Sequence, residues 1–342
     1  MKVVDLFAGL GAFSAGALAA GAEVILGVDH DPVPLKLWSA NVPGGRAVLS
    51  SLGSSSGDAV SLPPPSPHLH VHASTPCTDL SPARGRSATP ADVASGVCML
   101  RWALDLVLER GDYSWSLENV STPKTREVLA DYAAHFPEKV AFATLDAADF
   151  GSPQTRIRLI AGPPALIKLL QEMPSSKRVS VREAFACSGL DVPAPYLKNQ
   201  TRGRDGEPCR RSVEEQSFTI CASHALTWAT RGGETVKTMS ARDSAVLMGF
   251  DAAWRLPKGS RAAQKAVGNA MCVPMSRAIV QAAICLETGQ PLPVAPAAPL
   301  QTPEPLSTTA PDYCGGEYNK IKKRLRTIKT LLRELHESVV AP

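Results

Sequence analysis

The sequence predicts an α/β protein with a doubly wound, mostly parallel sheet and a smaller, irregular second domain. From residue 2 to residue 162, short apolar segments typical of buried strands alternate with longer helical segments. From about residue 165 to residue 260, mixed Pro, Gly and Arg residues replace this alternation. The 342 residues, of which 44% are hydrophobic, are sufficient for one large domain and one small one.

The chain opens with a strand–helix–strand unit. Residues 2–7 predict a buried strand, and the helix that follows a glycine-bearing turn extends to Ala20. A second strand is predicted over residues 23–28 and ends in Asp29, before a helix over residues 33–40. This order is typical of the first half of a doubly wound sheet.

The later elements continue this alternation. Residues 43–67 are rich in Ser, Gly and Pro, which predicts a loop with a weak strand at residues 47–50. An amphipathic helix is predicted over residues 91–110. Further strands are predicted at residues 68–73, 113–117 and 159–162, the last of which closes a hairpin.

We predict four regions from this pattern. The large domain comprises residues 1–164 and 262–285, and the small domain comprises residues 165–261. Residues 286–311 are rich in Pro, Ala and Thr, which predicts an extended linker. Residues 312–342 predict a basic amphipathic helix.

The apolar residues of this last helix recur in alternating steps of three and four, which is the spacing of a heptad seam. We therefore expect the helix to dock on the body of the protein or to self-associate weakly; the alternative is a coiled-coil dimer that also touches nucleic acid. The seam consists of Tyr318, Ile321, Leu325, Ile328, Leu332, Leu335 and Val339.

Composition limits the cellular setting and the partners. The net charge of +4 permits a nucleic-acid partner without requiring one. The eight cysteines contain no C-x-x-C pair, which is typical of reduced thiols in a cytoplasmic or nuclear protein. Asp5 and several glycines interrupt the apolar N-terminal run, so we expect no signal peptide, and no apolar stretch reaches the roughly 20 residues of a membrane span. We expect a soluble protein without a membrane partner and without a metal site.

The turn after the first strand carries the features of a cofactor site. It consists of Phe7, Ala8, Gly9, Leu10 and Gly11, and such a turn lets the backbone approach a ligand at a helix N-terminus. Ser14 stands where a dinucleotide fingerprint has its third glycine, which disfavours a nicotinamide dehydrogenase. Asp29 follows about 20 residues later, where a carboxylate accepts the hydroxyls of a ribose. An adenosine cofactor is favoured, and a simple packing turn is the alternative.

Two reactive groups end neighbouring strands. Cys77 follows Pro76 at the carboxyl end of one predicted strand, where a thiolate can act as a nucleophile; an inert buried thiol is the alternative. Glu118 ends the next strand, so we expect it to face the same crevice and to hold a proton, although it is also suited to a helix N-terminus. Arg156 and Arg158 share one strand face by the period of two, where they either hold a base, phosphate or carboxylate or form a solvated face.

Six segments in this order resemble the C5-cytosine DNA methyltransferase family over residues 1–285. They are FAGLG, Asp29, TPCTDLS, ENV, QTRIR and GNAMCVP. The resemblance implies a Rossmann-like methyltransferase fold with a small target-recognition domain. It also implies a DNA (cytosine-5-)-methyltransferase, of the kind found in restriction–modification, with S-adenosylmethionine as cofactor and double-stranded DNA as partner.

The family's roles carry over to matching positions. The resemblance implies that Cys77 attacks cytosine C6, that Glu118 binds and protonates N3, and that Arg158 with Arg156 holds O2 and the loop geometry. Thiolate addition makes C5 reactive, and the base must leave the duplex to reach these groups. The implied cofactor residues are Phe7, Ala8, Gly9, Leu10, Gly11, Asp29, His30, Pro76 and Asn269. The implied DNA-binding residues are Ser81, Arg84, Arg86, Gln154, Thr219, Ile220 and Arg242.

The sequence departs from the family pattern in several places. Thr78 replaces the usual glutamine after the nucleophile, Ala12 replaces a glycine, and Ser50 and Ser51 stand where an aspartate normally meets the adenine. The segment between Gly162 and Thr235 is short for target recognition, so we expect a short or degenerate target sequence. Two alternatives remain open, namely a tRNA methyltransferase of the same family and a catalytically weak DNA-binding regulator with the same fold.

Overall fold

A computed structural model describes residues 1–53, 60–77, 80, 89–173, 175–202 and 208–291. The predicted helix over residues 312–342 and all but the first six residues of the predicted linker lie outside these described residues. The same is true of the predicted DNA-binding residues Ser81, Arg84 and Arg86.

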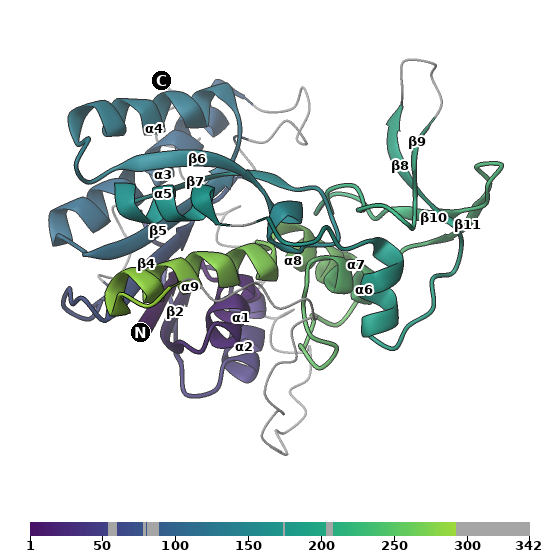
Figure 1. Ribbon diagram of the computed structural model, residues 1–342, viewed down its shortest axis with the longest axis horizontal. Helices are drawn as coiled ribbons and strands as arrows, with labels where there is room; N and C mark the ends of the chain where they lie inside the picture. Colours follow the sequence, from purple (N-terminus) through teal and green to yellow (C-terminus); the bar gives the residue numbers. More distant parts are fainter. Residues whose placement is uncertain (54–59, 78–79, 81–88, 174, 203–207, 292–342) are drawn as a thin grey trace, which may run out of the picture. The chain divides into compact units, whose positions relative to one another are not determined.

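A seven-stranded sheet forms the centre of the described chain, in the order β3-β2-β1-β4-β5-β7-β6 (Figure 1). Strands β1 to β5 pair in parallel, and β7 runs antiparallel to both β5 and β6. This arrangement confirms the predicted doubly wound, mostly parallel sheet, including the weak third strand and the closing hairpin. The strands are β1 (Lys2–Leu6), β2 (Glu23–Asp29), β3 (Arg46–Leu49), β4 (Leu69–Ser74), β5 (Ser114–Val120), β6 (Ala141–Asp146) and β7 (Ile157–Gly162).

Helices cover both faces of this sheet and enclose two apolar clusters. Helices α1 (Ala12–Ala19), α2 (Pro32–Asn41), α5 (Pro164–Glu172) and α9 (Val273–Thr288) contribute to the cluster on one face. Helices α3 (Pro90–Arg110) and α4 (Pro123–His135) contribute to the cluster on the other. Helix α1 approaches α9 closely because Gly16 has no side chain, since a Cβ there would lie 2.4 Å from the Cβ of Ser276.

Local sequence signals set the ends of these helices. Helix α3 begins with a capping box in which Thr89 and Asp92 bond each other's backbone N–H groups, and it ends at Gly111, which adopts φ 68°. Helix α2 begins at Pro32 after Asp31, whose side chain accepts from the N–H of Val33. The predicted bounds of α3 were therefore correct to within one residue.

The region after α5 contains a second, four-stranded antiparallel sheet in the order β11-β10-β8-β9. The sequence predicted only irregular structure here, because the short strands of this sheet carry polar and charged residues without apolar alternation. The strands are β8 (Tyr196–Arg202), β9 (Pro208–Ser212), β10 (Thr227–Ala229) and β11 (Thr235–Thr238). The shorter helices are η2 (Ala147–Phe150), which precedes β7, and α6 (Val181–Cys187), α7 (Ala241–Leu247) and α8 (Ser260–Asn269).

Within the described part of the chain, one helical stretch is long and apolar enough to cross a membrane by length and composition alone. It covers Ser260–Thr288, and 67% of its most apolar window is buried inside the protein. This is the placement of a core helix, and the stretch includes α9 in the cluster shared with α1.

Candidate active site

The order of the strands brings three sequence motifs to one edge of the large sheet. Strand β4 lies between β1 and β5, and all three run in parallel. The register pairs Leu6 with Ala73 and Ser74 with Glu118. The glycine turn after β1, Cys77 after β4 and Glu118 in β5 therefore meet at the same carboxyl edge, as the sequence analysis expected.

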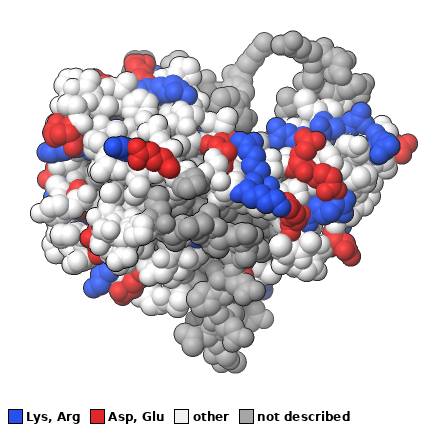
Figure 2. All heavy atoms as spheres, viewed as in Figure 1, with Lys and Arg blue, Asp and Glu red and all other residues white. Residues whose placement is uncertain are grey.

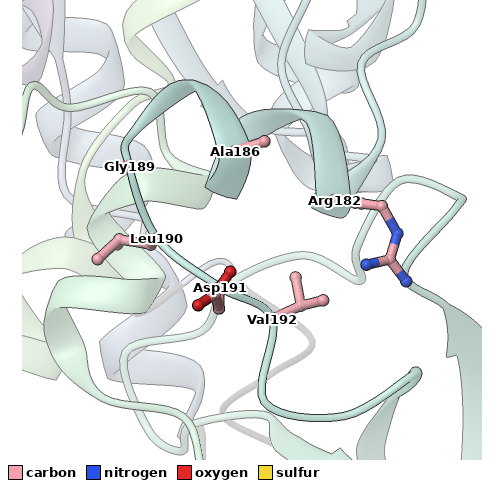
Figure 3. A pocket seen from close by; sticks show the side chains of 6 residues that line it. All are labelled: Arg182, Ala186, Gly189, Leu190, Asp191 and Val192. Carbon is pink, nitrogen blue, oxygen red and sulfur yellow. The ribbon is translucent and has the colours of Figure 1, made fainter.

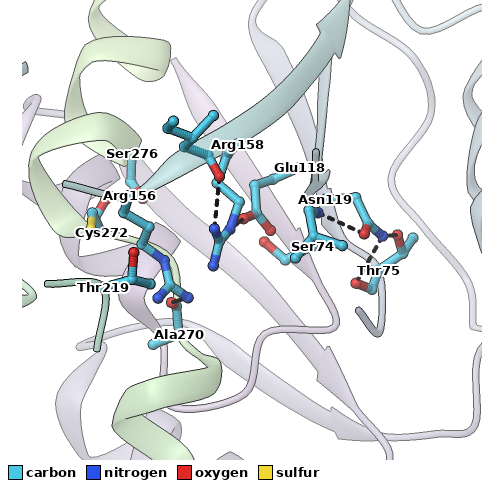
Figure 4. Close-up of polar contacts among 12 residues, drawn as sticks. Ser74, Thr75, Glu118, Asn119, Arg156, Arg158, Thr219, Ala270, Cys272 and Ser276 are labelled. Carbon is cyan, nitrogen blue, oxygen red and sulfur yellow. Dashed lines mark hydrogen bonds and ion pairs between the residues drawn. The ribbon is translucent and has the colours of Figure 1, made fainter. Parts of the chain in front are cut away.

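Glu118 forms a buried ion pair with Arg158 (Figure 4). The Nε atom of Arg158 lies 2.7 Å from Oε1 of Glu118, and both residues are at most 9% exposed. Arg158 also donates from Nη1 to the carbonyl of Ile157 at 2.8 Å, which fixes the plane of its guanidinium. Both charges are removed from water, so breaking the ion pair would leave an unpaired buried charge. The pair therefore holds the carboxyl group of Glu118 in one orientation at the sheet edge.

The charges around Cys77 oppose one another. Burial raises the pKa of the Cys77 thiol, and the negative charge of Glu118 raises it further. Arg158 and Arg156 act in the opposite direction. The protonated thiol is therefore favoured while Glu118 is ionised, and neutralising Glu118 favours the thiolate.

Arg156 does not face the crevice as a second base-binding group. It is 3% exposed, and its guanidinium donates to the carbonyls of Ile220, Gly268 and Ala270 at 2.8–3.1 Å. These bonds tie the start of β7 to two distant segments, so Arg156 holds loop geometry and leaves Arg158 at the site. Burial, followed by the charge of Arg158, lowers the pKa of Arg156.

Two of the predicted DNA contacts are wrong because the residues are buried. The amide of Gln154 donates to the carbonyl of Leu247 at 2.8 Å and accepts from the N–H of Ile220 at 3.0 Å. Gln154 is 0% exposed and Ile220 is 1% exposed, so neither side chain has a surface for DNA. The hydroxyl of Thr219 is likewise engaged, because it donates to the carbonyl of Thr155 at 2.7 Å. These residues anchor the second region to the edge of the large sheet.

The glycine turn and the end of β2 form a cradle. The carboxylate of Asp29 accepts from the N–H of Gly9 at 2.7 Å and from the N–H of Asp31 at 2.8 Å. His30 lies 3.3 Å from the same carboxylate, and this hydrogen bond raises the pKa of His30. Among the described residues Phe7 alone combines a side chain with a positive φ, at 58°, a conformation that often occurs where a backbone turns toward a ligand.

Two tryptophans that the sequence did not indicate pack against the glycine turn of this cradle. A Cβ at Gly11 would lie 2.7 Å from Trp38 and 3.2 Å from Trp254, so both rings approach the turn closely. The Trp38 indole donates to the hydroxyl of Ser14, and the Trp254 indole donates to the carbonyl of Leu10 at 3.1 Å. A glycine at position 11 indicates that another group comes close to the turn. The sequence does not show that this group is the ring of Trp38 or Trp254.

Two further tethers support the cradle from behind. Ser14 donates its hydroxyl to Asp5 at 2.6 Å, and burial raises the pKa of Asp5 to about 7. Arg242 donates from Nη1 to the carbonyl of Trp254 at 2.9 Å. Arg242, a predicted DNA contact, therefore supports the cofactor side of the molecule. The sequence gives Arg242 no signal that distinguishes these two roles.

Asn119 has a role that the sequence analysis did not assign. Its side-chain amide is fully buried and donates to the hydroxyl of Thr75 at 2.7 Å (Figure 4). This bond fixes the segment that leads into Pro76 and Cys77. The helix that follows is capped by Thr122 instead, whose side chain accepts from the N–H of Thr125. The predicted cofactor residue Asn269 is exposed at the end of α8.

Other candidate sites lie elsewhere or are missing from the described residues. A surface pocket of about 410 Å³ contains none of the predicted site residues (Figure 3). It is lined by Arg182, Ala186, Gly189, Leu190, Asp191 and Val192. In the described part of the chain, no group of three or more His, Cys, Asp or Glu residues could hold a metal ion.

Comparisons with known proteins agree with this geometry. Residues 1–162 match the family model described as C-5 cytosine-specific DNA methylase. The chain is 29% identical over 172 residues to the Type II methyltransferase M1.HphI of Haemophilus parahaemolyticus, which covers 47% of this chain and 45% of that protein. It is 23% identical over 311 residues to the Type II methyltransferase M.NlaX of Neisseria lactamica, which covers 82% of this chain and 95% of that protein.

The fold also resembles solved structures. One is described as a DNA modification methyltransferase encoded within a prophage of E. coli; it superposes with a TM-score of 0.59 at 15% identity, over 85% of this chain and 100% of that chain. At this identity the likeness concerns the fold alone.

The opposing charges around Cys77 generate a prediction. Glu118→Gln removes the negative charge that raises the thiol pKa, so it should lower that pKa and speed alkylation of Cys77 at pH 7 by roughly threefold to tenfold. The pH dependence of iodoacetamide labelling, followed on the Cys77 peptide by mass spectrometry, measures this effect. Glu127→Gln, an exposed site in α4, is the matched control and should change nothing. Unchanged or slower labelling in Glu118→Gln would refute the electrostatic account.

Proposed function

We propose that this chain, whose residues 1–162 match the family model described as C-5 cytosine-specific DNA methylase, transfers a methyl group from S-adenosylmethionine to carbon 5 of cytosine in double-stranded DNA. The reaction proceeds through a covalent adduct of the cytosine with Cys77. The observation that carries the proposal is the convergence of Cys77, the Glu118–Arg158 ion pair and the glycine turn at one sheet edge. The Type II methyltransferases among its relatives support a role in restriction–modification.

Cys77 and Glu118 act together on the cytosine ring. The Cys77 thiol first loses its proton to water, and the thiolate then bonds to C6 while Glu118 gives a proton to N3; the electron density released by this addition gathers at C5. After C5 is methylated, water accepts the C5 proton, the electron pair of that C–H bond re-forms the C5=C6 double bond and expels the Cys77 thiolate, and the N3 proton returns to Glu118. The covalent adduct thereby divides the difficult methylation of C5 into easier steps, and the ring regains its aromatic form at the end.

Arg158 orients this acid. Its ion pair holds the carboxyl group of Glu118 at the edge, and its guanidinium is suited to the O2 atom of the same cytosine. Arg156 and Asn119 act indirectly. Arg156 fixes the segment that follows Thr219, and Asn119 fixes the segment that precedes Cys77. The cytosine must be flipped out of the duplex to reach these groups, at a cost of a few kcal/mol that contacts in the pocket offset.

The residues around the glycine turn fit an adenosine cofactor. S-adenosylmethionine supplies an electrophilic methyl group when it is bound. Asp29 presents a carboxylate to ribose hydroxyls, and the absence of a side chain at Gly11 lets the Trp38 and Trp254 rings pack against the turn. Phe7, His30 and Pro76 are assigned to this cofactor on the family resemblance. Asn269 is assigned to the same cofactor on the family resemblance.

The four-stranded sheet is the proposed reader of the DNA sequence. The family pattern assigns target recognition to this region, predicted as residues 165–261, while residues 1–164 and 262–285 form the catalytic domain. Figure 2 shows Lys and Arg gathered among acidic residues over the part of the molecule that contains β8 to β11. Lys237 lies exposed on β11 and is suited to a phosphate contact, while Lys198 and Arg210 bond main-chain carbonyls of the same region.

Covalent trapping tests the proposed mechanism. DNA that contains 5-fluorocytosine cannot lose its C5 substituent as a proton, so the wild-type protein with S-adenosylmethionine should form a denaturation-resistant protein–DNA complex. Cys77→Ser should form none while it retains cofactor binding. Cys98→Ser removes an exposed thiol of α3 and should trap as well as the wild type. Trapping by Cys77→Ser, or no trapping by the wild type, would contradict the mechanism.

Methylation mapping tests the size of the target. The reading sheet consists of four short strands, so it contacts few base pairs, and we expect methylation of random-sequence DNA at a short or degenerate site. Bisulfite sequencing of the product gives the pattern. A strict requirement for about six or more defined base pairs would refute the expected short or degenerate site.

A further inference from the structure

Two buried histidines and three serines form a continuous chain of hydrogen bonds between β4 and β5. His70 is bonded through Nδ1 to Ser114 and through Nε2 to Ser116. His72 is bonded through Nδ1 to the same Ser116 hydroxyl and through Nε2 to Ser74. All four distances are 2.8 Å. We call the series Ser114–His70–Ser116–His72–Ser74 the serine–histidine chain.

The chain is enclosed by the fold. Both histidines are 0% exposed, and the ring of Phe13 in α1 stacks on His72 with a centroid distance of 3.5 Å and an interplanar angle of 3°. The same ring also stacks on His70. Burial lowers the pKa of both imidazoles, that of His70 to about 3. Both rings are therefore neutral near pH 7, and each offers one donor nitrogen and one acceptor nitrogen.

The shared hydroxyl of Ser116 couples the two rings. It has a single proton, so it donates to one imidazole and accepts from the other. Both rings consequently carry their proton on Nε2, or both carry it on Nδ1. These two arrangements point in opposite directions along the chain, and a proton that passes through converts one into the other.

Both ends of the chain are partly exposed, but only the Ser74 end has Glu118 as its register partner. Ser114 stands at the start of β5 and is partly exposed, so it can exchange protons with water. Ser74 stands at the end of β4, where the register pairs it with Glu118. Ser114, Ser116 and Glu118 alternate along β5 and share one face, as do His70, His72 and Ser74 along β4. Figure 4 draws no hydrogen bond between Ser74 and Glu118, so the last transfer requires the Ser74 hydroxyl to turn toward the carboxyl group of its register partner.

We propose that the serine–histidine chain is a relay that carries a proton between water at Ser114 and the carboxyl group of Glu118. The relay rests on the proposed function, because that mechanism needs Glu118 to enter the reaction with a proton. In the structure Glu118 is paired with the guanidinium of Arg158. A proton must therefore reach a residue that lies 7% exposed behind the sheet edge, and the chain provides a route.

The proton transfers balance. An ionised Glu118 accepts the hydroxyl proton of Ser74, which receives the Nε2 proton of His72. His72 in turn takes the proton of Ser116 on Nδ1, and the same exchange repeats through His70 to Ser114, which accepts a proton from water. Glu118 then gives its proton to N3, regains it when the Cys77 thiolate leaves C6, and returns it along the chain. One inward and one outward transfer restore the starting arrangement.

The relay also acts on the nucleophile. A protonated Glu118 no longer carries the charge that disfavours the Cys77 thiolate. One delivered proton therefore prepares both the acid for N3 and the sulfur for C6. The histidines and serines of the relay are positioning and transfer groups, since none of them touches the base.

The rate of covalent trapping in H₂O and in D₂O tests the relay. With saturating 5-fluorocytosine DNA and S-adenosylmethionine, Ser116→Ala interrupts the chain at its centre. It should slow trapping by about tenfold or more and change the solvent isotope effect of this step. Ser116→Thr keeps a hydroxyl and should restore both values. Ser276→Ala removes a buried hydroxyl that bonds only a helix carbonyl, and it should behave as the wild type.

Thermal stability and cofactor affinity are measured for every variant. If Ser116→Ala does not fold, Ser74→Ala interrupts the partly exposed end of the chain and should show the same loss. Wild-type rate and isotope effect in a folded interrupted variant would overturn the relay, as would a loss that Ser116→Thr does not restore. In both cases the wild type still traps, so the proposed function stands. A wild type that does not trap would overturn both.

Discussion

The buried ion pair between Glu118 and Arg158 is the interaction on which the site depends. A carboxylate at 7% exposure is stable only with a partner, and Arg158 provides one from an antiparallel strand that follows Glu118 by 40 positions in the chain. The reversed direction of β7 is what points Arg158 back toward the carboxyl edge. Burial raises the pKa of the nearby Cys77 thiol, and the two charges of this pair shift that pKa in opposite directions.

The second region is attached to the same edge by buried polar bonds. Gln154 and Arg156 both precede β7. Their side chains donate hydrogen bonds to main-chain carbonyls near residues 220, 247 and 268. A shift of the small sheet would therefore break several buried hydrogen bonds, each of which costs about 1–3 kcal/mol to leave unmade. Gln154, Thr219 and Ile220, which the family resemblance assigned to DNA contact, instead fix the position of the surface that we propose reads the DNA.

The sequence predicted the large sheet well, because alternating apolar segments and capped helices are local signals. It also predicted that Cys77 and Glu118 share an edge, since both follow parallel strands. It could not resolve the small sheet, whose strands lack apolar alternation, nor distinguish Gln154 and Arg156 from surface groups of the same type. The alternation of His70 and His72 indicated a strand, but their serine partners depend on a pairing register that only the folded chain reveals.

Nucleoside analysis tests the central claim most directly. Duplex DNA and tRNA are each incubated with the wild-type protein and S-adenosylmethionine, digested to nucleosides, and examined by mass spectrometry. The account predicts 5-methylcytosine from duplex DNA and none from the Cys77→Ala or Glu118→Ala variants. Methylation of an exocyclic amine, methylation of tRNA alone, or an undiminished product from either variant would contradict it.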